Sequence, residues 1–354
     1  MTFFRRLLFF SVMILLSHGL FVCSWSDEIR YAGEMSYLPV GAAISAMGDA
    51  GVALPGRAVS SHWNPAASSM SSDFEISAEY ANLFWGLSHH GVFAFAAPIQ
   101  NSMGFSGLWI PYYSGMITKW DTLSGTYLER LHDPNLRPDG SGVGYLYNTH
   151  QMIVLSLSRL FPLSMPRAAA SGLPRSADFA AGINFRGLWQ TMHLDDKVRL
   201  GMNATFDIGM LVRFGIDYDF ARKIVSRQLT LGFSWRNIVP SQITWTHSDD
   251  GSGKREYREP VHGVQMYGIT YTDKSGIAGA NWVISGAIQN GYSLTYHIGL
   301  EGEFWETVSF RAGLSDKVPT MGAGIRYRNY HLDYAFRFDQ LDHSPLRLSF
   351  GVKF

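Results

Sequence analysis

The feature that most constrains this chain is an alternation of apolar and polar residues, with a period of two, that begins after residue 72. In the final segment, Leu348, Phe350 and Val352 are separated by Ser349 and Gly351. The same alternation runs through residues 228–235, 294–301, 308–315, 321–328 and 331–339. Because successive side chains of a strand point to opposite faces, this period predicts β-strands with one apolar and one polar face.

The length of these segments favours a sheet that crosses a membrane. They run to about ten residues, enough to cross a bilayer at a tilt, whereas ordinary strands have about five or six. Arg and Asp lie on the polar face, as a hydrated lumen requires. Aromatic residues gather near segment ends, as in the girdles of outer-membrane barrels: Tyr327, Tyr330, Tyr334, Phe336, Phe338 and Phe354. We predict an all-β fold, a transmembrane antiparallel up-and-down β-barrel; a soluble β domain is the alternative.

Composition narrows the function classes. Charged residues make up 16% of the 354 residues, against about 25% in a typical soluble domain. The 29 basic residues are matched by 29 acidic ones, so the chain lacks the basic surplus that nucleic-acid binding needs. Its single cysteine can form neither an intramolecular disulfide nor a cysteine-based zinc site. We therefore expect no nucleic-acid partner.

Residues 1–26 have the pattern of a cleavable secretory signal peptide. Arg5 and Arg6 precede an apolar run from Leu7 to Val22, and small residues at alternate positions follow. An uncleaved membrane anchor is one alternative, and lipidation of Cys23 is another. Export through this signal predicts the bacterial cell outer membrane, where a closed barrel satisfies every backbone group between its strands.

The alternation predicts about 14 strands, an even number as bacterial single-chain barrels require. The expected bounds are 73–84, 88–98, 101–112, 147–160, 178–190, 200–216, 228–238, 260–272, 279–289, 293–304, 307–315, 320–328, 330–339 and 345–354. Long outer loops at 113–146 and 239–259 are expected to alternate with short inner turns. The inner stretch 161–177 is longer than this rule predicts, and we expect a small periplasmic element there.

Residues 27–72 do not alternate, and we expect them to form a plug inside the barrel. The stretch from Val40 to Leu54 is rich in Gly and Ala, which permit close packing. Asn64 is biased away from the α region by Pro65, which can itself begin a helix. A barrel of about 14 strands is wider than side chains alone can fill. The predicted domains are a signal peptide at 1–26, a plug segment at 27–72 and the barrel at 73–354.

Both ends of the mature chain resemble a known group of outer-membrane proteins. Gly41 to Leu54, followed by Trp63-Asn64-Pro65-Ala66, resembles the N-terminal signature of PorV/PorQ-like proteins, which are related to FadL-type fatty-acid transporters. Arg311-Ala312-Gly313 and the runs from Pro319 to Gly324 and from Asn329 to Phe336 resemble the C-terminal half of the PorV-like group. The middle of the chain is recognisable only as alternating strands.

The resemblance implies a 14-stranded barrel with an N-terminal hatch and offers two functions. FadL-type members imply a channel for long-chain fatty acids or other hydrophobic solutes. PorV-type members imply a scaffold or shuttle in the secretion or surface attachment of exported proteins. The residues alone also leave open a soluble or lipid-anchored periplasmic β protein. Expected partners are outer-membrane lipid, a hydrophobic small-molecule ligand and, for the second function, secretion-system proteins.

Three sets of residues are candidates for the site. Asn64, Pro65 and Ala66 match the hatch motif of the resembled family. Charges expected on the lumen face form the second set, and an ion-pair lattice is favoured there over a substrate track: Arg311, Arg326, Arg328, Asp333, Arg337 and Asp339. Aromatic residues of the long outer loop form the third set, where a hydrophobic ligand is expected to enter: Trp120, Tyr127 and Tyr145.

The remaining motifs favour no enzyme, metal or cofactor. The stretch from Gly251 to Lys254 resembles a phosphate loop only superficially, because Arg255 stands where Ser or Thr is needed. His89 and His90 are adjacent on a predicted strand and should point to opposite faces, which disfavours a shared metal ion. No catalytic triad or nucleophile elbow is recognisable, so we predict that the chain is not an enzyme.

Overall fold

The structure is a computed structural model, and it divides into two compact units, Met1–Tyr31 and Ala32–Phe354. The described residues all lie in the second unit: 33–100, 102–120, 122–136, 142–163, 176–194, 197–219, 224–239, 241–249, 253–276, 279–338 and 346–354. The predicted signal peptide at 1–26 therefore lies outside the described residues. So do residues 164–175, where a small periplasmic element was expected.

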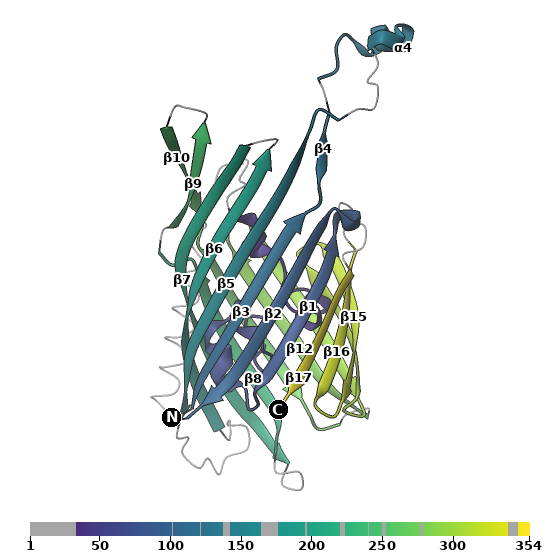
Figure 1. The fold of residues 1–354 in the computed structure, drawn as a ribbon. Coiled ribbons are helices and arrows are strands. Elements are labelled where there is room, and N and C mark those ends of the chain that lie inside the picture. The colour runs from purple at the N-terminus through teal and green to yellow at the C-terminus, as the bar shows by residue number, and fades with distance from the viewer. Residues whose placement is uncertain are drawn as a thin grey trace. The chain divides into compact units, whose positions relative to one another are not determined.

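The described strands form one antiparallel sheet of 17 strands, and 14 of them close into a ring. Each ring strand pairs with the next one, and β1 closes the ring on β17, from Glu75 opposite Lys353 to Asn82 opposite Leu346 (Figure 1). The ring strands are β1 (Glu75–Leu83), β2 (Ser88–Ile99), β3 (Met103–Ser114), β5 (Gly144–Leu163), β6 (Ser176–Leu194), β7 (Lys197–Asp219), β8 (Ile224–Arg236), β11 (Val264–Asp273), β12 (Ala280–Asn290), β13 (Leu294–Phe304), β14 (Val308–Ser315), β15 (Val318–Tyr327), β16 (Tyr330–Arg337) and β17 (Leu346–Lys353). The predicted antiparallel barrel of 14 strands is confirmed.

The other three strands lie in the outer connections and were not predicted. β4 (Ile117–Lys119) pairs with β5, while β9 (Ser241–Asp249) and β10 (Gly253–Val261) form a hairpin that pairs with β7. The alternation did not predict β10, because Glu256, Tyr257 and Arg258 are all exposed and successive residues therefore do not alternate between apolar and polar.

The ring strands differ greatly in length. β5, β6 and β7 have 20, 19 and 23 residues, whereas β14, β16 and β17 have eight each. Figure 1 shows that these long strands and the β9–β10 hairpin rise above the opposite rim of the barrel. The end of the barrel that carries them is called the loop side here, and the C-terminus lies at the other end.

The two faces of the ring are the reverse of those of a soluble protein. Phe350 is 46% exposed and faces outward, whereas its strand neighbour Arg347 is 5% exposed and faces inward. Every ring strand carries at least one large exposed apolar side chain: Ile76, Phe93, Trp109, Leu155, Phe185, Phe206, Trp235, Ile269, Ile284, Ile298, Phe310, Met321, Leu332 and Phe350. A continuous apolar exterior of this kind needs an apolar environment.

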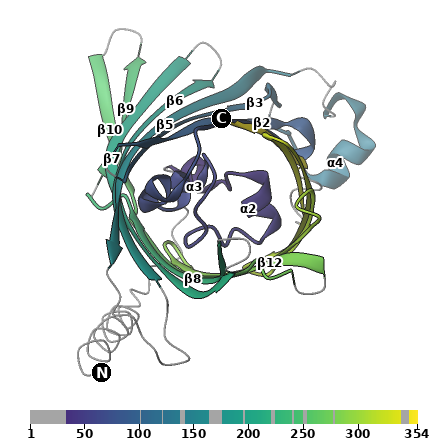
Figure 2. The ribbon, with the colours of Figure 1, turned by 90° about the horizontal axis from the view of Figure 1, so that it is seen from below.

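Residues 33–72, called the inner segment here, lie inside the ring. This segment holds η1 (Glu34–Tyr37), α2 (Ala42–Ala46), α3 (Ser60–Trp63) and η2 (Pro65–Met70). Figure 2 shows α2 and α3 enclosed by the strands. α2 contacts β14 to β17, and η2 contacts β2, β3, β5, β6 and β7, so the segment touches the wall on both sides. Its role as a plug stays a prediction.

The remaining helices lie in connections on the loop side. η3 (Phe84–Gly86) joins β1 to β2, while α4 (Tyr127–His132) and η4 (Pro134–Leu136) follow β4. None of the helices among the described residues is long and apolar enough to cross a membrane.

Inward-facing glycines allow the inner segment to approach the wall. A Cβ atom at any of eight strand positions would come within 3.0 Å of another backbone or side-chain atom, in each case including one of the inner segment: Gly104, Gly182, Gly209, Gly232, Gly268, Gly299, Gly313 and Gly322. At Gly313, for example, the nearest atom would be the backbone nitrogen of Gly48. Because protein interiors are packed densely, the segment could not occupy this position if larger residues stood there.

We predict that Gly209→Ala and Gly313→Ala each lower the free energy of unfolding by about 1–3 kcal/mol, because the added methyl groups overpack the contact with the inner segment. The free energy of unfolding is measured by urea titration of the purified barrel, with the folded fraction read from its heat-dependent mobility on a gel. Gly286→Ala is the matched control, since a Cβ there would have only ordinary contacts at 3.9 Å. Equal effects of all three substitutions would contradict the prediction.

Candidate functional site

The Asn64-Pro65-Ala66 motif joins two helices of the inner segment and fixes them to the wall. The Oδ1 of Asn64 accepts a hydrogen bond from the backbone N–H of Ala66 at 3.0 Å, and Pro65 occupies the first position of η2, where no N–H donor is needed. The Nδ2 of Asn64 lies 3.0 Å from the carbonyl oxygen of Met210 and 3.2 Å from that of Phe233. All three motif residues are buried, so their contacts are structural.

A buried cluster of ion pairs ties the inner segment to the wall. Asp333 on β16 is shared by two arginines: its Oδ2 lies 2.6 Å from Nη1 of Arg57, and its Oδ1 lies 2.7 Å from Nη1 of Arg311. Arg311 also contacts the carboxylate of Glu301. Since breaking a buried pair leaves an uncompensated charge, this cluster holds Arg57 and the inner segment in one position.

Two more of the predicted lumen charges have carboxylate partners. Nη1 of Arg337 lies 3.1 Å from Oδ2 of Asp49 in the inner segment, which forms a second tie to the wall. Nη1 of Arg326 lies 2.7 Å from Oε1 of Glu303 on β13. Each of these two arginines is thus paired with one carboxylate; that the lumen charges form an ion-pair lattice and not a substrate track stays a prediction.

Arg328 departs from its predicted place on the lumen face. It occupies the turn between β15 and β16 with a φ of 54°, and its guanidinium lies over the ring of Tyr327, 5.3 Å from the centroid. Arg328 and Asn329 form a two-residue turn, so β15 ends at Tyr327, whereas the alternation predicted a strand that continues to residue 328. Asp339, the last predicted lumen charge, lies outside the described residues.

A cavity of about 490 Å³ lies at the loop-side end of the barrel, bounded by the inner segment and by the wall. The wall contributes residues near the loop-side ends of strands, among them Leu83, Arg236 and Arg337. The inner segment contributes Tyr37, Leu38, Pro39, Ser45, Asp49 and Trp63. Apolar and charged side chains therefore meet in one concave site, the arrangement expected of a small-molecule pocket.

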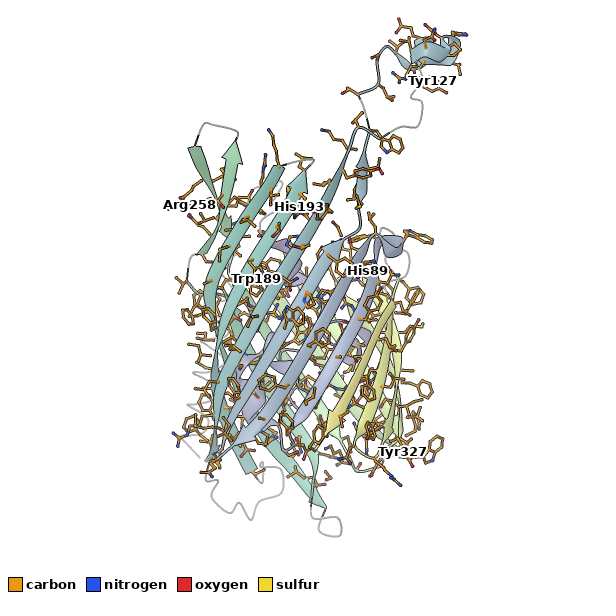
Figure 3. All side chains as sticks on the ribbon, in the orientation of Figure 1. His89, Tyr127, Trp189, His193, Arg258 and Tyr327 are labelled. Carbon is orange, nitrogen blue, oxygen red and sulfur yellow. The ribbon has the colours of Figure 1, made fainter. Side chains whose placement is uncertain are left out.

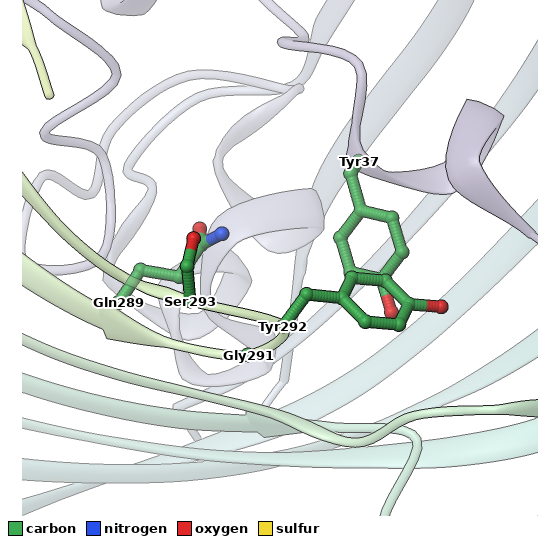
Figure 4. A pocket seen from close by; sticks show the side chains of 5 residues that line it. All are labelled: Tyr37, Gln289, Gly291, Tyr292 and Ser293. Carbon is green, nitrogen blue, oxygen red and sulfur yellow. The ribbon is translucent and has the colours of Figure 1, made fainter. Parts of the chain in front are cut away.

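Tyr37 also borders a second, smaller pocket of about 290 Å³ (Figure 4). Its ring packs edge-on against Tyr292 of the β12–β13 connection, with centroids 5.4 Å apart. Its hydroxyl donates a hydrogen bond of 3.0 Å to the carbonyl oxygen of His262, which lies between β10 and β11. The inner segment is thereby bound to two connections on the loop side.

The structure does not bring the predicted aromatic loop residues to this cavity. Trp120, Tyr127 and Tyr145 are 57%, 72% and 50% exposed, and none of them lines either pocket. Figure 3 shows Tyr127 on α4, beyond the barrel. A capping box between Thr126 and Glu129 begins this helix, and the hydrogen bond from the Thr126 backbone holds the pKa of Glu129 below its usual value.

The two adjacent histidines point to opposite faces, as predicted. His89 faces outward and stacks on Tyr113 at a centroid distance of 4.7 Å, whereas His90 is buried inside the ring. Among the described residues, no group of three or more His, Cys, Asp or Glu side chains is placed to hold a metal ion.

The sequence did not single out Tyr37 or Arg236, although both line the cavity. Tyr37 lies in the stretch that does not alternate, where no pattern indicates which side chain faces a pocket. Arg236 directly follows the alternating run 228–235, so its place on the polar face could have been predicted from Trp235 beside it.

No protein-family model matches this chain, and no curated protein matches it in sequence. Among solved structures, the toluene transporter TodX of Pseudomonas putida has a TM-score of 0.45 at 10% identity, covering 89% of this chain and 97% of that one. The CymD monoaromatic hydrocarbon channel has a TM-score of 0.32 at 11% identity, covering 89% and 97%. The translocator domain of the autotransporter NalP from Neisseria meningitidis has a TM-score of 0.35 at 9% identity, covering 80% and 89%.

We predict that Asn64→Ala lowers the free energy of detaching the inner segment from the wall by about 1–3 kcal/mol, because it removes buried hydrogen bonds to β7 and β8. Trypsin cleavage at Arg57, followed by mass spectrometry, should become faster in this variant. Asn329→Ala is the control, since Asn329 donates its hydrogen bond to Lys353 from an exposed turn. If both variants are cleaved at the wild-type rate, the motif does not fix the segment.

Proposed function

We propose that this chain is an outer-membrane channel of the FadL type for hydrophobic or amphipathic solutes, with the inner segment as its plug. Two features support the membrane location: the ring has no unpaired edge, and all its strands present apolar side chains outward. The observation that carries the function is the loop-side cavity, which is bounded by the inner segment rather than by the wall alone.

The lining of the cavity combines apolar surface with polar and charged groups, which suits an amphipathic ligand. Leu38, Trp63 and Phe336 provide apolar surface, while Thr295 and His297 provide hydrogen-bonding groups. Its volume of about 490 Å³ falls within the range typical of small-molecule sites. Long-chain fatty acids, which the resemblance implies, are one class of solute that such a site could bind.

Passage of a solute requires the plug to move. The inner segment is held on one side by Asn64 and η2 and on the other by the ion pairs of Arg57 and Asp49. A covalent bond between the segment and the wall should therefore stop transport without altering the barrel.

We predict that the double variant Ser68→Cys/Ser158→Cys, once oxidised, loses uptake of hydrophobic solutes. The two hydroxyl oxygens lie 2.7 Å apart, one on η2 and one on β5, so a disulfide can join the plug to the wall. Uptake of radiolabelled 4-phenylbutan-1-ol by cells that make each variant provides the measurement. We expect uptake to fall to the level of cells without the protein, and a reducing agent to restore it.

The matched control is Ile284→Cys/Leu300→Cys. These two residues lie opposite each other on the neighbouring strands β12 and β13 and both face outward, so their disulfide joins wall to wall without a contact with the inner segment. This variant should take up the solute at the wild-type rate. Unchanged uptake through the oxidised plug-to-wall variant would show that the inner segment does not gate a channel.

A scaffold for exported proteins, as in PorV-like proteins, is the second candidate function. The observation that favours it is the raised wall of β5, β6, β7 and the β9–β10 hairpin, which a channel alone does not need (Figure 1). Sheet that stands above the rim is available to a partner outside the cell.

If the chain is a scaffold, replacing residues 246–256 with a Gly-Ser-Gly turn should abolish recovery of exported proteins in pull-downs from membranes. The same variant should keep its uptake of 4-phenylbutan-1-ol, because the tip of the hairpin lies away from the cavity lining. Pull-downs of the intact protein that contain no secretion component or exported cargo would exclude this function.

A further inference from the structure

Helix α3 brings polar side chains without partners against the wall. The hydroxyl of Ser61 and both ring nitrogens of His62 have no hydrogen-bond partner among the described residues. Both residues are only 1% exposed, so water does not reach these groups while α3 lies in this position. Because a buried polar group without a partner carries the full cost of its desolvation, these two side chains weaken the attachment of α3.

The wall that faces α3 also has buried polar groups without a partner in the described part of the chain. They are Nε2 of His90, Oδ1 of Asn184, and Nε and Nη2 of Arg236. Asn184 contacts α3 directly, because its Nδ2 donates a hydrogen bond of 2.9 Å to the carbonyl oxygen of Ser61. Arg236 does so through its guanidinium, which lies over the indole of Trp63, 5.3 Å from the ring centroid. The two surfaces therefore meet with several polar groups unpaired, which favours the entry of water between them.

The wall charges nearest His62 add up to a positive one. Arg186 on β6 is neutralised by Asp207 on β7, because its Nη2 lies 2.7 Å from Oδ2 of the carboxylate. Arg236 on β8 forms no ion pair within 4.0 Å among the residues that the structure describes. A protonated His62 would therefore stand beside a net positive charge in a buried place, where repulsion between like charges is strong.

The other neighbours of His62 do not offset this charge. Nδ1 of His90 on β2 lies 3.4 Å from Nη1 of Arg347, and the same Nη1 lies 2.8 Å from Oε1 of Glu79. Within the inner segment, η2 packs against α3 and consists of Pro, Ala, Ser and Met, which do not titrate. The carboxylates of Asp207 and Glu79 thus both have an arginine partner already.

His62 is neutral while α3 is attached. The residue belongs to the inner segment and not to a membrane-spanning strand. Burial, followed by the positive charges of Arg236 and Arg186, holds the pKa of its imidazole well below the usual value of 6.5. An imidazole in water has a pKa of about 6.5, so a detached α3 binds a proton more readily than an attached one. Attachment is therefore strongest above about pH 6.5 and weakens as the pH falls below that value.

We propose that His62 is a pH-dependent switch in the inner segment, and that its protonation releases α3 from β2, β6 and β8 and opens the barrel on that side. This inference rests on the proposed function, because it takes the inner segment to be the plug of a channel. The segment stays attached at Arg57, which pairs with Asp333, and at Asn64, which donates to the carbonyl oxygen of Met210, so only the residues between them move. Acidification thereby increases the open fraction of the channel.

The test measures how firmly α3 is attached at different pH values. Hydrogen–deuterium exchange, followed by mass spectrometry, is applied to the full-length mature barrel in lipid nanodiscs, and each rate is divided by the intrinsic rate of the same peptide at that pH. The backbone amides of His62 and Asn64 donate to the carbonyl oxygens of Val59 and Ser60, so they report on α3. Between about pH 6.5 and about pH 5.5 we expect the corrected exchange of residues 58–64 to rise by about tenfold. A peptide of β13, residues 294–301, should show no such change.

Variants assign the pH response to one imidazole. His62→Gln cannot be protonated in this range and should exchange at the same corrected rate at both pH values. His150→Gln is the matched control: both ring nitrogens of His150 are also buried without a partner among the described residues, but this histidine lies on β5 and packs edge-on against Tyr112. His132→Gln removes an exposed histidine of α4. Both control variants should keep the response of the wild type.

Several outcomes would overturn the proposal. A corrected rate that does not change with pH in the wild type rules out the switch, and this result does not depend on the folding of any variant. A response that survives in His62→Gln assigns the titration to another group. A response shared equally by the β13 peptide shows that acid unfolds the barrel instead of releasing α3.

Uptake of 4-phenylbutan-1-ol at the two pH values separates this inference from the proposed function. Faster uptake at the lower pH in the wild type, but not in His62→Gln, supports both. If acid releases α3 and the cells take up no solute at either pH, the switch stands and the channel function fails. If uptake occurs equally at both pH values and α3 is not released, the channel function stands and this inference fails.

Discussion

The pairing of β1 with β17 is the contact on which the rest of this structure depends. A sheet with an apolar outer face can stand in hydrocarbon only if each backbone N–H and C=O has a partner, and closure supplies those partners at the two ends of the sheet. Closure also fixes the circumference at 14 strands, which leaves an interior that side chains cannot fill. The inner segment occupies part of the space that the side chains of the wall leave open.

The interior is built to receive this one segment. Glycines on eight strands let its backbone approach the wall, and Asn64 holds it to β7 and β8. Ion pairs at Asp333 and Asp49 hold it to β14 to β16. Contacts of three kinds, on opposite sides of the ring, therefore determine a single position. The charged residues that a soluble protein would place outside are used here to orient a part of the chain inside.

The sequence predicted the ring well and the site poorly, for physical reasons. Alternation reports which face of a strand meets an apolar environment, so it located all 14 ring strands, and it failed for β10, which is exposed on both faces. Lumen charges such as Arg311 and Asp333 could be predicted because they lie on strands. Their partner Arg57 could not, because it belongs to a segment without a period. The exposed aromatic residues of α4 drew attention by composition alone, which gives no position relative to a cavity.

Tyr37 is shared by both pockets, and this has a mechanical consequence. The residue forms part of the boundary of the larger cavity, while its ring and hydroxyl rest on Tyr292 and His262. Movement of Tyr37 would therefore change the boundary of both pockets. It would also require the contacts with Tyr292 and His262 to move with it or to break, so these contacts couple the position of the inner segment to that of the loop-side connections.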